Sequence, residues 1–145
     1  MATCAPSLFT ALIHTETGAW NAVESALSEA GNALTLGRYL ILRTVRDTPA
    51  CRVQEVAASQ GITLGAASRL VDRLHRDGLL HRTPCKHDRR ATILTVTDQG
   101  LAHLEEACTI VEKEQERLFA PLSTAQRDEL THILALIAEA SKERA

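Results

Sequence analysis

The stretch 62–97 constrains the fold most, because its hydrophobic pattern changes along its length. Between Thr63, which can cap a helix, and a stop at Asp77-Gly78, apolar residues recur at helical spacing. After Pro84, the run 86–90 holds no apolar residue, and the segment 92–97 is rich in β-branched residues. This pattern predicts a helix followed by a two-stranded hairpin with a basic tip.

Charge separates this stretch from the rest of the chain. Residues 69–90 hold seven Lys or Arg against three Asp, whereas the whole chain has a net charge of -2. A charged run of this kind is commonly a solvated face. An Arg-bearing helix followed directly by an Arg-tipped hairpin also suits the phosphates and grooves of a DNA duplex.

The remaining segments predict further helices around this centre. Apolar periodicity indicates helices at about residues 6–30, 35–46, 52–60 and 101–119, and a last one after a Ser123 cap. The helix 52–60, a turn at Gly61 and the helix after Thr63 form a predicted helix-turn-helix. From Asp98 onward there are ten acidic and five basic residues, so we expect this end to face away from DNA.

Length and composition bound the class of protein. A chain of 145 residues with 45% hydrophobic content is one ordinary globular domain. It has no apolar run of membrane length and no secretory signal pattern, so we expect a soluble, cytoplasmic protein. The cysteines are too widely spaced for a disulfide framework or a zinc ribbon, and the motifs of common enzyme classes are missing. We therefore predict no metal, no cofactor and no catalytic activity.

Three blocks of the sequence resemble the multiple-antibiotic-resistance regulator (MarR) family of winged helix-turn-helix transcription factors. They are 68–74 with 77–79, then 88–91, then 94–100. In that family these blocks are the recognition helix, the wing tip, and the strand that returns into a long dimerisation helix. The family more often has larger polar side chains at Gly65 and Ala66, so base contacts are expected from Ser68 and Arg69.

The resemblance implies a mainly α fold with a small β-hairpin wing. Residues 34–100 would form the winged helix-turn-helix, and residues 1–33 and 101–145 the dimerisation helices. The expected function is a transcriptional repressor that binds a palindromic double-stranded DNA operator as a homodimer. An architectural DNA-binding or protein-interaction module without an effector is the alternative.

Two groups of residues are predicted to contact DNA. Those on the recognition helix are Thr63, Ser68, Arg69 and Arg73, and those on the wing are Lys86, Asp88, Arg89 and Arg90. By resemblance Arg90 enters a minor groove, with Asp88 bracing the loop through a salt bridge to it. Alternatively, Arg73 pairs with Asp77 one turn along the helix.

The regulatory input has two candidates, because members of the family respond to small aromatic or phenolic anions or to oxidants. Trp20, Arg38, Tyr39 and Arg43 could line an effector cleft, since an aromatic wall with cations suits an aromatic acid. The alternative is that both aromatic residues belong to the core and both Arg are solvated.

Oxidation would act through Cys4 or Cys51, which would need a lowered thiol pKa. Inert thiols are the alternative.

Overall fold

The computed structural model describes residues 7–142 and contains six helices and one two-stranded sheet in that range. The elements are α1 (Leu8–Glu29), α2 (Leu36–Asp47), α3 (Val53–Gln60), α4 (Leu64–Arg76), β1 (Leu80–Pro84), β2 (Thr92–Val96), α5 (Asp98–Phe119) and α6 (Thr124–Lys142). This confirms the predicted mainly helical fold with a small hairpin. No helix among the described residues combines the length and the apolar character that crossing a membrane requires.

Hydroxyl groups fix where several helices begin. The side chain of Thr63 accepts the backbone N–H of Ala66 at the start of α4. Ser123 accepts the N–H of Gln126, whose side chain accepts the N–H of Ser123 in return, so the last helix starts with a reciprocal cap. These caps confirm the helix starts predicted at Thr63 and Ser123.

Gly61 follows the last residue of α3, and Gly78 follows Asp77 at the end of α4. Both have left-handed backbone conformations, with φ of 63° and 75°. This conformation favours glycine because it has no Cβ. Gly61 therefore allows the tight turn between α3 and α4, and Gly78 allows the chain to leave α4 and enter β1 at once.

The hairpin pairs antiparallel from Leu80 opposite Val96 to Pro84 opposite Thr92. Its second strand is also tied to the helical part, because the N–H of Leu94 donates to the carbonyl of Cys51 over 2.8 Å. Pro84 is the last residue of β1, a strand end where its missing N–H costs no ladder hydrogen bond. The wing is therefore fixed at its base and free at its tip.

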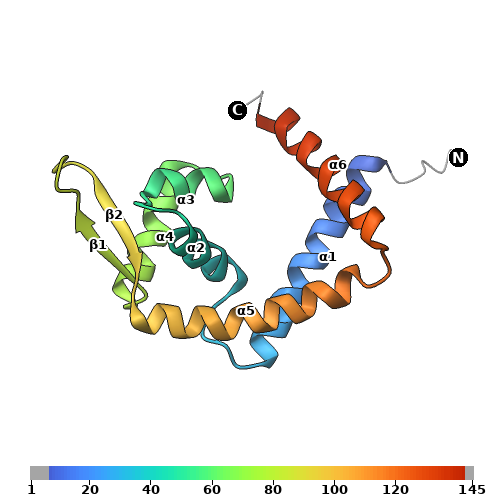
Figure 1. Ribbon diagram of the computed structural model, residues 1–145, viewed down its shortest axis with the longest axis horizontal. Helices are drawn as coiled ribbons and strands as arrows, with labels where there is room; N and C mark the ends of the chain where they lie inside the picture. Colours follow the sequence, from blue (N-terminus) through green and yellow to red (C-terminus); the bar gives the residue numbers. More distant parts are fainter. Residues whose placement is uncertain (1–6, 143–145) are drawn as a thin grey trace, which may run out of the picture.

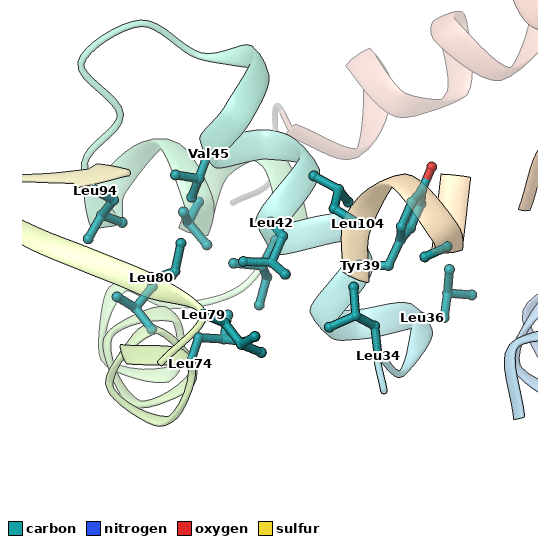
Figure 2. Packing of buried hydrophobic residues seen from close by; sticks show 14 of the residues in the cluster. Leu34, Leu36, Tyr39, Leu42, Val45, Leu74, Leu79, Leu80, Leu94 and Leu104 are labelled. Atoms are coloured by element: carbon teal, nitrogen blue, oxygen red, sulfur yellow. The ribbon is translucent and has the colours of Figure 1, made fainter. Parts of the chain in front are cut away.

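The core lies within the lobe formed by α2, α3, α4 and the hairpin, and α5 closes it (Figure 1). Its fully buried leucines come from six elements: Leu27 of α1, Leu42 of α2, Leu74 of α4, Leu80 of β1, Leu94 of β2 and Leu104 of α5. Figure 2 labels the last five of them. Because α2, α4, both strands and α5 each supply a buried leucine and α3 supplies the fully buried Val56, α4 and the wing are held by one packed unit.

The two terminal helices lie at the other end of α5 (Figure 1). In α1 only Val23 and Leu27 are buried, whereas Phe9, Ile13 and Trp20 of the predicted apolar stripe are exposed. No residue of α6 is buried. One chain therefore leaves the apolar faces of both terminal helices uncovered.

Candidate nucleic-acid interface

The helix α4 presents a row of basic side chains to solvent. Arg69, Arg73 and Arg76 are exposed, and none of them forms an ion pair with another described residue. Arg76 was not among the predicted DNA contacts, although it follows Arg69 by two helical turns. The i, i+7 spacing was the signal that would have found it.

Asp77 does not pair with Arg73, the alternative that the sequence left open. It accepts from the guanidinium of Arg38 over 2.5 Å, which joins the end of α4 to α2. Sequence spacing favoured the local partner, whereas the tertiary packing of α2 on α4 supplied another. Arg73 therefore keeps its charge free at the surface.

The wing tip carries three further exposed cations, Lys86, Arg89 and Arg90. The predicted salt bridge between the side chains of Asp88 and Arg90 is wrong, because Asp88 contacts the backbone of Arg90 instead. The carboxylate of Asp88 accepts the backbone N–H of Arg90 over 3.0 Å, an aspartate turn that shapes the loop. The guanidinium of Arg90 is left exposed and without an ionic partner among the described residues.

Arg82 has a different role from the other basic residues. Its guanidinium lies 2.7 Å from the carboxylate of Asp72, which ties strand β1 to helix α4. This pair was not predicted, because the two residues belong to elements whose relative placement only the fold defines. It fixes the separation of wing and recognition helix and removes Arg82 from the set of free cations.

Thr63 and Ser68 are less available than the arginines. The Thr63 hydroxyl accepts the capping hydrogen bond, which leaves its own hydrogen free to donate, and Ser68 is half-buried. The interface that the structure brings together is therefore chiefly six free cations: Arg69, Arg73, Arg76, Lys86, Arg89 and Arg90. We call these six side chains the basic surface.

A cavity of about 400 Å³ lies between α1, α2 and α4. Trp20 and Arg38, two of the four residues predicted for an effector cleft, line it, and Arg73 of the basic surface lines it as well. Trp20 is 40% exposed, so it is a wall of the cavity rather than a core residue. The cavity thus adjoins both the terminal helix α1 and the helix α4 that carries the row of basic side chains.

Arg43 and Tyr39 lie elsewhere, which corrects the prediction of one cleft. Arg43 lines a second cavity of about 570 Å³ on the other side of Trp20, where it lies 3.7 Å from the carboxylate of Asp47. Tyr39 is 3% exposed and packs in the core. Its position one residue after Arg38 turns it by about 100° around the helix, away from the cavity.

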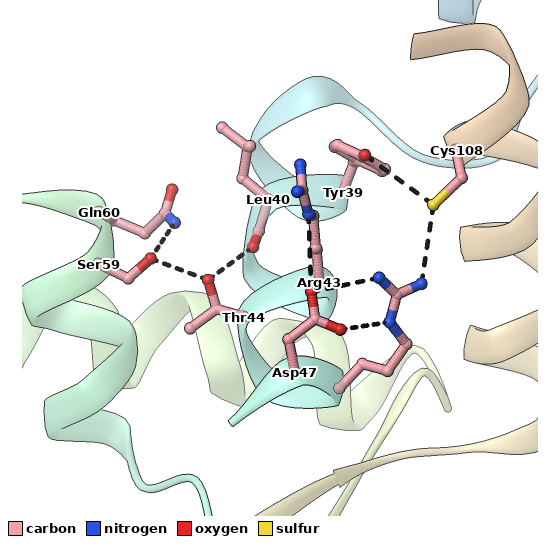
Figure 3. Close-up of polar contacts among 9 residues, drawn as sticks. Tyr39, Leu40, Arg43, Thr44, Asp47, Ser59, Gln60 and Cys108 are labelled. Carbon is pink, nitrogen blue, oxygen red and sulfur yellow. Dashed lines mark hydrogen bonds and ion pairs between the residues drawn. The ribbon is translucent and has the colours of Figure 1, made fainter. Parts of the chain in front are cut away.

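Tyr39 contacts Cys108 of α5 instead (Figure 3). The Cys108 thiol donates to the Tyr39 hydroxyl over 3.9 Å and accepts from the guanidinium of Arg46 over 3.7 Å. Burial raises the pKa of Tyr39, and the adjacent Cys108 sulfur raises it further. These contacts join α2 to α5.

The predicted redox residues receive no support. Cys51 is fully buried, and burial together with the nearby Glu55 carboxylate raises the pKa of its thiol. Reactive thiols require the opposite shift, so Cys51 has the environment of an inert core residue. Cys4 lies outside the described residues. Within the described part of the chain, no three His, Cys, Asp or Glu side chains converge as metal ligands would.

A helix-turn-helix with free cations on its second helix and on the adjoining hairpin defines a class, the winged helix-turn-helix DNA-binding proteins. The family model of the MarR family matches residues 34–92, from α2 to the start of β2. The transcriptional repressor CouR, solved bound to a 23-mer DNA duplex, is 30% identical and covers 91% of this chain and 92% of its own, with a TM-score of 0.82. The chain therefore belongs to the MarR family of transcriptional regulators.

Two further proteins are similar to this chain, one in fold and one in sequence. BpsR of Bordetella bronchiseptica, whose DNA binding is regulated by 6-hydroxynicotinic acid, is 21% identical over 95% of this chain and 97% of its own, with a TM-score of 0.84. The HTH-type transcriptional regulator BilQ of Clostridium symbiosum is 28% identical over 77% of this chain and 76% of its own. These proteins are regulators rather than enzymes.

Proposed function

We propose that this protein is a repressor that binds a palindromic operator as a homodimer. In each subunit α4 enters a major groove, and the wing tip with Arg90 reaches the neighbouring minor groove. The basic surface carries this proposal, because six free cations on α4 and on the adjoining wing of an otherwise acidic chain suit a row of phosphates. CouR, a relative over nearly the whole chain, was solved on a DNA duplex.

The dimer is proposed from the uncovered apolar residues of the terminal helices. On α1 these include Phe9 and Ile13, and on α6 they include Ile133, Leu134 and Ile137, all of them more than a third exposed. A second copy of the chain would bury both faces at once. A two-fold pair then presents two recognition helices to half-sites about 34 Å apart, one turn of the duplex.

Replacement of Arg90 by Ala tests the wing assignment. We expect operator affinity to fall by about 1–3 kcal/mol, because one charge-assisted contact in the groove is lost. The slope of log affinity against log salt should become shallower by about one unit. Fluorescence anisotropy with an operator selected from genomic fragments measures both quantities.

Lys113→Ala is the matched control, because Lys113 is an exposed cation of α5 outside the basic surface. It should leave affinity and salt slope unchanged. Equal affinities for the Arg90→Ala variant and the wild type would refute the role of Arg90. Absence of any preferred DNA sequence in the selection would refute the operator-binding function itself.

We propose further that a small aromatic carboxylate binds the cavity beside Trp20 and releases the DNA. The cavity volume of about 400 Å³ falls in the range of small-molecule sites, and it combines an indole with two guanidinium groups. Arg73 belongs to both the cavity and the basic surface, so an anion bound there competes with phosphate for the same cation. BpsR, a structural neighbour, responds to an aromatic acid.

A panel of aromatic carboxylates tests this proposal. Trp20 is the single Trp of the chain, so its fluorescence reports binding in this region directly. We expect a bound acid to change this fluorescence and to displace labelled operator over the same concentration range. Arg38→Gln should lower the affinity for the acid by about tenfold, as expected for loss of one charge-assisted hydrogen bond.

Arg43→Gln is the control for this experiment, because Arg43 lines the second cavity rather than the first. It should bind the acid as the wild type does. A loss of binding in Arg43→Gln with no loss in Arg38→Gln would place the ligand in the second cavity and contradict the proposal.

A further inference from the structure

The first residue of the recognition helix is a large apolar side chain in solvent. Leu64 is 60% exposed, although Ala67, Val71 and Leu74 on the same side of α4 are fully or almost fully buried. The apolar stripe of the helix thus continues one turn beyond the end of the core. Nothing in the core requires an apolar residue at this position, because the packing stops at Ala67.

Leu64 also faces a groove rather than a flat surface. The groove measures about 330 Å³ and runs between the start of α3, the start of α4 and the tip end of the wing. Arg52 and Gln54 line it on one side, and Arg90 and Thr92 line it on the other. Leu64 therefore lines the groove together with the apolar Val53 and Ala91, and Arg52 and Arg90 bring two positive charges against the one negative charge of Asp88.

The neighbouring Gly65 leaves further room at the front of the helix. A Cβ at this position would meet nothing within 4 Å. Glycine within a helix costs about 1 kcal/mol relative to alanine, and no contact inside the chain explains the choice. The open space beside Leu64 lets an outside partner approach the helix backbone closely.

We propose that Leu64 selects thymine in each half-site by contact with the 5-methyl group. This inference rests on the proposed operator binding, because it requires the start of α4 to lie in a major groove. Major-groove edges present hydrogen-bond donors and acceptors, and the thymine methyl is their apolar exception. A leucine side chain offers no hydrogen bond to any base edge, whereas it can pack against the 5-methyl group, which only thymine carries.

The experiment compares thymine with uracil, which lacks only the methyl group. An operator is first selected from random duplexes, and each thymine is then replaced singly by deoxyuridine. For the wild type, we expect one position per half-site to lose about fourfold in affinity, the value of one buried methyl group. The variant Leu64→Ala should bind the thymine operator about as weakly as the wild type binds the uracil operator. Its affinities for the two operators should be equal.

Leu64→Met is the matched variant, because methionine keeps an apolar side chain of similar size. It should retain the preference for thymine over uracil. Both variants change an exposed residue, so their melting temperatures should equal that of the wild type.

Several outcomes would overturn the inference, and they separate it from the operator-binding proposal. If a specific operator is found but Leu64→Ala keeps the full preference for thymine, the inference fails and operator binding stands. The same holds if no thymine position responds to loss of its methyl group. If the selection yields no preferred sequence, operator binding fails and the inference fails with it.

Discussion

Gly100→Ala should destabilise the protein by about 3 kcal/mol or more, because a Cβ at this position has no space. It would lie 2.4 Å from the carbonyl oxygen of Leu79 and 2.7 Å from a methyl group of Val96. The carbonyl belongs to the backbone, so the clash cannot be relieved by a change of rotamer. Thermal and urea unfolding at one fixed protein concentration measure the loss, which should lower the melting temperature by about 10 °C.

The position of Gly100 gives this prediction a functional consequence. Its N–H donates to the hydroxyl of Thr97, and that hydroxyl donates to the carbonyl of Gly78 over 2.7 Å. The start of α5 is thereby seated directly on the chain that leaves the recognition helix. Displacement of α5 by an added Cβ should therefore weaken DNA binding along with stability.

Gly18→Ala is the control, because Gly18 lies within α1 and a Cβ there would meet no atom within 4 Å. This variant should be as stable as the wild type or more stable by up to about 1 kcal/mol, the difference in helix propensity. The expected fall in melting temperature for Gly100→Ala is about 10 °C. A melting temperature within about 2 °C of the wild type would refute the tight approach of α5 to Leu79.

The double variant Ile133→Asp, Ile137→Asp should convert the proposed dimer into monomers. These side chains lie one turn apart on α6 and are exposed in the single chain. Burial of two unpaired carboxylates in an apolar interface carries a large desolvation penalty. Sedimentation equilibrium measures the state of association, and operator affinity should fall about a hundredfold or more because the half-sites are no longer bound by one linked pair.

A second double variant, His132→Asp with Ala135→Asp, controls for added negative charge on the same helix. Both positions are exposed and lie on another side of α6. This protein should remain a dimer and bind its operator. Dimers in the Ile133 and Ile137 variant, or a monomeric wild type, would contradict the proposed arrangement of the terminal helices.

Much of the fold could be predicted from local patterns. The caps at Thr63 and Ser123, the turn at Gly61 and the hairpin after Gly78 each depend on residues close in sequence. Such signals are local because a hydroxyl cap or a left-handed glycine acts within a few residues. The charge pattern of residues 69–90 likewise indicated the basic surface before its geometry was known.

Pairings between distant residues could not be predicted in this way. Arg38 forms an ion pair with Asp77, and Arg82 forms one with Asp72, because α2 and β1 are packed against α4. The four residues predicted for one effector cleft lie in different places, because the packing of α2 against its neighbours decides which side chain faces which cavity. Arg38 and Arg43 are five residues apart on one helix but line different cavities, and Tyr39 points into the core.

The order of helices and strands, their limits and the positive charge of the recognition helix and wing follow from the sequence by itself, since they depend on periodicity, capping and composition. The tertiary structure alone decided which arginines are free and which are paired, that Cys51 is enclosed, and that Leu64 and the apolar residues of α6 remain in solvent. The physical reason is that burial and ion pairing depend on which elements meet in space. That information is distributed over the whole chain rather than carried by any one segment.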